Sequence, residues 1–285
     1  MAETILDSMT EQYNSLTRSG KKLANYILAN TVAVQYLSIN SLAENSGVSE
    51  ASITRFCRKM GLSGYNDLKI ALAKSGRTTD LGDSCHTPEA IDSGDDLSAI
   101  SQKLSDSYLA AFRETREQLN PDTFYQAVDL LCRSRHVFCF GQGASMVMAM
   151  EAWARFSVVT STFSHIPDSH MQVITTALAT SEDAILFFSY SGSTRDLQEV
   201  LHLAKERSIP VILITHFPNS PAAELADVVL LCGYNESPLQ SGSISAKMGQ
   251  LFLIDCLFYA YCGRNLEKSA AARISVSEAV SRKLL

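Results

Sequence analysis

Four short apolar runs recur through the second half of the chain, and segments with a helical pattern separate them. The runs cover residues 137–140, 184–188, 211–214 and 228–231. Strands that are apolar at every position are buried on both faces, which is typical of a parallel sheet covered by helices on both sides. The pattern therefore predicts an α/β domain, and Val158-Val159 is expected to begin one further strand.

Helical patterns lie between and after these runs. They cover residues 145–157, 169–178 and 194–207, followed by a long apolar segment from Ile244 and an amphipathic tail over 264–285. A helix that is apolar on every side packs against protein on every side. We therefore expect the apolar segment, residues 244–262, to be a helix that also suits a dimer face.

The first quarter of the chain has a different organisation. Residues 3–74 have a helical pattern throughout, whereas residues 76–96 are rich in Gly, Ser, Thr and acidic residues and have no apolar period, which is typical of a solvated linker. A helical pattern resumes near Leu97. We predict an all-α domain, a linker with a connecting helix, the α/β domain and a C-terminal helix, over residues 1–77, 78–118, 119–263 and 264–285.

Charge is distributed unevenly between these parts. The net charge is −6, which argues against a general nucleic-acid coat or a basic membrane binder. Residues 1–77, however, hold nine Lys and Arg against six Asp and Glu, while the rest of the chain carries the acidic excess. A basic part on an acidic chain indicates that the basic part meets a polyanion.

The cysteines and the chain start indicate a cellular compartment. Seven cysteines, an odd number without a C-x-x-C pair, are typical of reduced thiols, so we expect a cytoplasmic protein. No metal-ligand cluster stands out, and no metal or cofactor is expected. The N-terminus lacks the features of a signal peptide. The apolar stretch 251–262 is interrupted by Asp255 and is too short to span a bilayer, so no membrane partner is expected.

Residues 41–60 have the pattern of a helix-turn-helix. One short helix is expected to end at Ser46, Gly47 supplies the turn, and Ser49 caps a second helix. In that second helix the apolar side chains share one face and polar ones share another, as in a helix that enters a DNA major groove. An ordinary helical hairpin with solvated charges is the alternative. The candidate DNA-binding residues are Ser49, Ser52, Thr54, Arg55, Arg58 and Lys59.

Two loops rich in Ser and Gly follow two of the apolar runs, and each leads into a helix. They cover residues 141–145 and 189–194. Ligands of open α/β sheets bind at the carboxyl ends of strands, where helix N-termini favour an anion. The two loops therefore predict a phosphate site. A dinucleotide site would need a third glycine where Met146 stands, and tight turns without a ligand are the other alternative.

Together the two halves resemble the RpiR family of transcriptional regulators. The resemblance covers about residues 3–263, through the stretch from Val48 to Lys69 and two motifs of the SIS (sugar isomerase) domain. These motifs are Gly141-x-Gly143-x-Ser145 and Ser189-x-Ser191-Gly192-x-Thr194. The resemblance implies an α/β SIS domain, with a parallel sheet flanked by helices, preceded by an all-α helix-turn-helix domain.

In SIS domains the S-x-S-G-x-T loop holds a sugar phosphate. The resemblance therefore implies that hydroxyl groups of this loop bind the phosphate, with backbone groups of the loop and Ser145 completing the site. Glu236 would touch a sugar hydroxyl, or would be an ordinary surface carboxylate, and Ser220, in a different loop, is expected to contribute little. The implied ligand-binding residues are Gly143, Ser145, Ser189, Tyr190, Ser191, Gly192, Ser193, Thr194 and Glu236.

The predicted function is a DNA-binding transcriptional regulator of carbohydrate metabolism genes, with operator DNA and a sugar phosphate effector as partners. A homodimer or homotetramer is expected, because one helix-turn-helix reads few base pairs. The alternatives are a SIS-type phosphosugar isomerase or lyase and a non-catalytic oligomerisation module. An isomerase needs a general base, for which His165, His170, His216 and Glu236 are candidates. A helix-turn-helix would be idle in a simple isomerase, so no catalytic residue is assigned.

Overall fold

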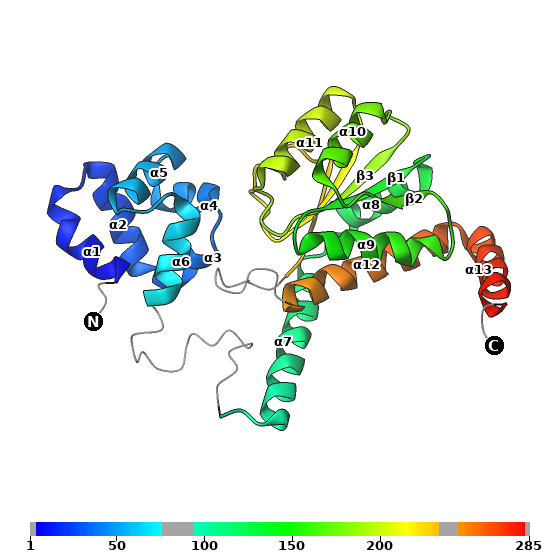
Figure 1. The fold of residues 1–285 in the computed structure, drawn as a ribbon, viewed down its shortest axis with the longest axis horizontal. Coiled ribbons are helices and arrows are strands. Elements are labelled where there is room, and N and C mark those ends of the chain that lie inside the picture. The colour runs from blue at the N-terminus through cyan, green and yellow to red at the C-terminus, as the bar shows by residue number, and fades with distance from the viewer. Residues whose placement is uncertain (1–3, 76–93, 234–243, 283–285) are drawn as a thin grey trace. The chain divides into compact units, whose positions relative to one another are not determined.

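A computed structural model describes residues 4–75, 94–233 and 244–282 of the chain. These residues form two compact units, and the division falls inside helix α7, after Asp106 (Figure 1). Most of the predicted linker lies outside the described residues. No helix in the described ranges is long and apolar enough to cross a membrane.

The first unit contains only helices in the range 4–75. Apolar side chains three and four residues apart, such as Leu23 and Ile27 of the second helix, face inward, and the unit has a hydrophobic core of its own. The predicted core residues of the fifth helix, among them Ile53 and Phe56, are buried there. The elements are α1 (Ile5–Gln12), η1 (Tyr13–Ser15), α2 (Arg18–Ala29), α3 (Thr31–Tyr36), α4 (Ile39–Ser46), α5 (Glu50–Lys59) and α6 (Tyr65–Ser75).

The second unit is built on a sheet of five parallel strands in the order β2-β1-β3-β4-β5. The strands are β1 (Val137–Gly141), β2 (Phe163–His165), β3 (Ala184–Phe188), β4 (Val211–Thr215) and β5 (Val228–Leu231). The helices are the part of α7 (Leu97–Glu117) that follows Asp106, α8 (Pro121–Arg133), α9 (Ser145–Ser157), α10 (Ser169–Leu178), α11 (Arg195–Glu206), α12 (Ile244–Arg264) and α13 (Leu266–Ser281).

Helices cover both faces of this sheet, as the apolar runs predict. Helices α8, α9 and α12 pack against one face, and α10 and α11 lie on the other (Figure 1). Along β3, Leu186 and Phe188 join the first core, whereas Ile185 and Phe187 join the second. All five residues of β3 are buried, which is why this strand has no polar position.

Two expectations from the sequence are wrong in detail. Val158 and Val159 do not begin a strand, because Val159 N–H donates to Phe156 O at 3.0 Å and so continues the end of α9. The further strand is β2, which begins at Phe163. Helix α12 is mainly a core element: Leu253, Leu257 and others are fully buried against the sheet, so most of it is not available as a dimer face.

Helix α13 is the least buried helix of the second unit. Of its sixteen residues only Ser269 is buried, while Leu266, Ile274 and Val280 are exposed. A helix of this length gains most of its stability from packing. The structure holds it to α12 chiefly through Arg273, whose guanidinium contacts the Sγ of Cys262 and the ring of Phe258.

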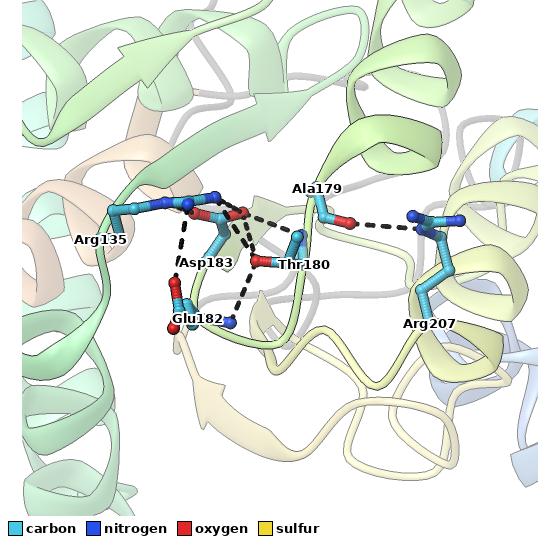
Figure 2. Close-up of polar contacts among 6 residues, drawn as sticks. All are labelled: Arg135, Ala179, Thr180, Glu182, Asp183 and Arg207. Carbon is cyan, nitrogen blue, oxygen red and sulfur yellow. Dashed lines mark hydrogen bonds and ion pairs between the residues drawn. The ribbon is translucent and has the colours of Figure 1, made fainter.

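An ion pair with a buried carboxylate joins the amino ends of β1 and β3 (Figure 2). Arg135 donates from Nε and Nη2 to the two carboxylate oxygens of Asp183, each at 3.1 Å. Asp183, which is 2% exposed, also accepts from the N–H and hydroxyl of Thr180. Burial alone would raise the pKa of the Asp183 carboxyl, but these hydrogen bonds outweigh it and hold that pKa below its ordinary value.

We expect Asp183→Asn to lower the free energy of unfolding by about 1.5–3 kcal/mol at pH 7, because it removes charge-assisted hydrogen bonds at a buried position. A depressed pKa in the folded state stabilises the protein above the unfolded pKa, about 3.9, and this stabilisation is lost as the pH falls through the folded value. The difference between parent and variant should therefore narrow below about pH 4. Urea denaturation at a series of pH values measures it.

Glu182→Gln is the matched control, since Glu182 is an exposed carboxylate 3.6 Å from the same Arg135. Exposed ion pairs contribute about 0–1 kcal/mol, so the free energy of unfolding of this variant should be close to that of the parent. Equal losses in the two variants would contradict the assignment of the stabilisation to Asp183.

Candidate functional site

The turn between α4 and α5 has the geometry that the sequence predicts. Helix α4 ends at Ser46, and Gly47 follows with φ +61°, a left-handed conformation that favours glycine. The end of the Lys22 side chain lies against Gly47, where a Cβ would displace it. Lys22 Nζ donates to Gly47 O at 3.0 Å and so holds the turn against α2. The two helices are thus fixed as a helix-turn-helix.

The polar side of α5 carries the candidate DNA-binding residues in a connected series. Ser49 caps the helix by accepting from the Ser52 N–H at 3.3 Å, and Arg55 Nη2 donates to Ser52 Oγ at 3.0 Å. The Thr54 hydroxyl donates back to Glu50 O, so it is used within the helix. Arg55 is exposed, and its guanidinium lies over the first turns of α5. This arrangement keeps a cation and two small hydroxyl groups together on the surface.

The last two candidates lie in the final turn of α5. Arg58 and Lys59 are both exposed, and cations are favourable at a helix C-terminus. Lys59 Nζ donates to Ser15 O, a carbonyl at the end of η1. That contact bridges 44 positions of sequence, so Lys59 has a structural role within the first unit in addition to its predicted one.

The two loops of the second unit lie side by side because they follow neighbouring strands. β1 pairs with β3, with Gly141 opposite Phe188, and loops 141–145 and 189–194 begin at this end of the sheet. The Thr194 hydroxyl of the second loop donates to Gln142 Oε1 of the first at 3.3 Å. The structure therefore brings the two predicted loops together, in direct contact.

The helices that follow these loops begin without a side-chain cap. Neither α9, after the first loop, nor α11, after Thr194, has a side chain bound to its first N–H groups. Among the described helices, α3 and α13 also lack such a cap, whereas seven have one: α1, α2, α4, α5, α7, α8 and α10. At α9 the first two N–H groups, those of Ser145 and Met146, donate to the backbone carbonyls of Gln142 and Gly143. Both helix N-termini still carry a partial positive charge, which suits an anion.

Ser189 and Gly192 form the tight part of the second loop. Ser189 is 5% exposed, and its hydroxyl accepts from the Gly192 N–H at 3.2 Å. Gly192 has φ +59°, and a Cβ there would collide with the side chain of Ser220. Ser220 belongs to a different loop, as the sequence indicates, but it is fully buried and its side chain lies close to Gly192.

The remaining residues of the site are more accessible. Ser191 is half-buried, and its hydroxyl accepts from the exposed Ser193 at 3.4 Å, N to Oγ. The ring of Tyr190 stacks on His216 with centroids 5.0 Å apart. In the first loop, Gly143 has φ +54° and Ser145 is the half-buried first residue of α9. Glu236 lies outside the described residues.

The candidate general bases are held by backbone carbonyls. His165 Nδ1 contacts Cys139 O at 3.2 Å, and His216 Nδ1 contacts Cys232 O at 2.9 Å. Because a carbonyl only accepts, Nδ1 carries the proton in both rings. His170 is exposed on α10. Within the described ranges no group of three or more His, Cys, Asp or Glu side chains is placed to hold a metal ion.

Sequence reasoning missed two glutamines of this site. Gln142 stands between the glycines of the first loop, and Gln172 lies on α10, fully buried. Gln142 Nε2 donates to Gln172 Oε1 at 3.4 Å. Gln142 occupies a variable position of the motif Gly-x-Gly-x-Ser, and a polar residue in an apolar helix carries no signal of what it contacts, so neither was singled out.

Comparison with known proteins agrees with both halves of this description. A family model for the helix-turn-helix domain of the rpiR family matches residues 3–78, and a model for the SIS domain matches residues 130–260. An HTH-type transcriptional regulator of Caldanaerobacter subterraneus is 34% identical, over 89% of either chain. The regulator HexR of Pseudomonas aeruginosa is 31% identical, over 90% of this chain and 88% of its own.

A solved structure is similar over almost the whole length. The Vibrio vulnificus NanR protein complexed with ManNAc-6P matches with a TM-score of 0.87 and 25% identity, and 99% of each chain is covered. The curated relatives span both units and are named as regulators. The chain therefore belongs to the RpiR family of transcriptional regulators, with a helix-turn-helix domain followed by a SIS domain.

Proposed function

We propose that this regulator controls genes of carbohydrate metabolism by binding operator DNA through α5 and a sugar phosphate through loops 141–145 and 189–194. DNA binding is assigned to residues 1–77 and effector binding to residues 119–263, joined by residues 78–118. The C-terminal helix within the remaining residues, 264–285, is α13. The protein would have one state that binds operator DNA well and one that binds it poorly. The effector would change the affinity for DNA by binding one of these states more tightly than the other.

One observation carries the effector part of this proposal. Two helix N-termini without side-chain caps, those of α9 and α11, begin at two adjacent loops that hold Ser145, Ser191 and Thr194. Backbone N–H groups and hydroxyls at one sheet edge suit the oxygens of a phosphate. Relatives support the choice of ligand, since the NanR structure contains ManNAc-6P.

We also propose that the chain acts as a homodimer or homotetramer held through its α/β units. Exposed apolar side chains gather on the outer sides of two neighbours of the edge strand β2. They are Met146, Val147, Met150 and Trp153 on α9, and Met171, Ile174 and Leu178 on α10. Exposed apolar side chains on α9 or on α10 can mark an interaction site, and two half-sites on DNA are usually read by a dimer.

Arg55→Ala should weaken binding to operator DNA by about 1–3 kcal/mol, because Arg55 is an exposed cation on the polar side of α5 and a base contact has that value. A gel-shift titration at fixed salt, with the DNA upstream of the protein's own gene, measures it. Arg18→Ala, an exposed arginine at the start of α2, is the matched control and should bind nearly as the parent does. Unchanged affinity in Arg55→Ala would remove Arg55 from the DNA-binding surface.

Ser191→Ala should lose about tenfold to a hundredfold in sugar phosphate affinity, since a hydrogen bond to a charged group contributes roughly 1.5–3 kcal/mol. Calorimetry with hexose and amino-sugar phosphates, including N-acetylmannosamine 6-phosphate, measures the loss. The operator affinity of the free variant should be that of the parent. Ser181→Ala, at an exposed position in the turn before β3 and so at the other end of the strands, is the control. If Ser191→Ala binds the best ligand as tightly as the parent, the phosphate does not lie in this loop.

Light scattering should give the mass of a dimer or tetramer at micromolar concentration. Met150→Glu should lower this mass, because it places a charge among the exposed apolar side chains of α9 and α10. Lys247→Glu, on α12, serves as a charge-changing control. A monomer mass for the parent chain, with and without DNA, would contradict the proposed assembly.

A further inference from the structure

The orientation of the buried amide of Gln172 follows from its neighbours. Gln172 is fully buried, which is unusual for a polar side chain of this size. Its Nε2 donates to the carbonyl oxygens of Ile166 at 2.8 Å and Gly141 at 3.3 Å. A carbonyl oxygen has no proton to give, so both of these positions require the NH2 end of the amide. The Oε1 end of Gln172 must therefore face Gln142.

The orientation of Gln172 determines that of the Gln142 amide, which in turn determines the direction of the Thr194 hydroxyl. Because Gln172 presents Oε1, Gln142 must present Nε2 to it, and these atoms are 3.4 Å apart. Gln142 Oε1 then faces Thr194, whose hydroxyl donates to it at 3.3 Å. A hydroxyl has one proton. The proton of Thr194 that an anion would need is thus already directed at Gln142.

We propose that Gln142 is a positioning residue of the effector site that competes with the ligand: its amide holds the Thr194 hydroxyl until a phosphate oxygen takes that proton. This inference rests on the proposed binding of a sugar phosphate at the two loops, and it adds how the site is regulated. Gln172 sets the direction of the competing bond. Ligand binding therefore breaks the contact between loops 141–145 and 189–194 rather than adding to it.

Loss of the bond between Thr194 and Gln142 also affects the first loop. Gln142 also contacts Gln172, which connects the first loop to Ile166 after β2 and to α10. When Thr194 turns to the phosphate, Gln142 Oε1 loses its donor, and an amide that has lost one of two anchors is free to rotate. Occupancy of the second loop is in this way communicated to the first loop by the loss of one hydrogen bond.

If Gln142 competes with the ligand, replacing it should change the phosphate affinity in the opposite direction to that expected if it holds the ligand. If Gln142 competes, its removal tightens the binding of a phosphate. If it holds the ligand, its removal weakens binding. Gln142→Met retains the length of the side chain and removes both hydrogen-bonding groups, so it separates the two roles. Gln142→Ala is a second variant that does the same with a smaller side chain.

The experiment is a calorimetric titration of the full chain with inorganic phosphate, glucose 6-phosphate and N-acetylmannosamine 6-phosphate. We expect Gln142→Met to bind the phosphate ligand about twofold to tenfold more tightly than the parent, the range that one net hydrogen bond represents. Thr194→Val should bind more weakly. Adding Gln142→Met to Thr194→Val should change nothing further, because the competed hydroxyl is then absent.

Gln198→Met is the matched control, since Gln198 donates from Nε2 to Gly192 O at 3.3 Å and supports the same loop without contacting the Thr194 side chain. It should not bind the ligand more tightly. Weaker or unchanged binding in Gln142→Met and Gln142→Ala would overturn the inference, as would an equal gain in the Thr194→Val background. If the parent chain binds none of the three phosphates, the proposed function fails instead, and the two failures are distinguishable.

Discussion

The pairing of β1 with β3 is the constraint on which the site depends. These strands are neighbours in a parallel sheet, so both of their carboxyl ends open at the same edge. Their amino ends are joined by the ion pair of Arg135 with Asp183, at the opposite edge of the sheet (Figure 2). Between them the strands are buried among two layers of helices. The two loops therefore start from a rigid base that is held at both ends.

Much of the second unit could be predicted because its strands are buried on both faces. Runs 184–188 and 228–231 and helices 145–157 and 169–178 agree with the structure, since an unbroken apolar run and a 3.6-residue period each report burial directly. The edge strand β2 was not located correctly, because it is not buried on both faces. It has three residues, of which only Phe163 is buried, so its sequence carries little of the signal that identifies a strand.

Contacts made by polar side chains over long separations could not be predicted. The faces of α5 follow from spacing, yet nothing in the spacing indicates that Lys59 reaches Ser15 or that Lys22 reaches Gly47. In the second unit, the polar residues of the loops are found from their motifs, whereas Gln172 is identified only by what surrounds it. A buried amide is determined by its partners, and those partners meet only when the chain has folded.

The uncapped start of α11 links the stability of the second unit to the ligand proposed for it. A side-chain cap at the start of α11 would stabilise that helix by about 1 kcal/mol, but its oxygen would occupy the N–H groups at the end of loop 189–194. The anion of the proposed effector would accept hydrogen bonds from those N–H groups in place of a capping side chain. The free energy of unfolding of the second unit would then rise with the concentration of that anion, by mass action. The melting temperature of this unit would then increase, and its rate of proteolysis decrease, as the ligand concentration rises.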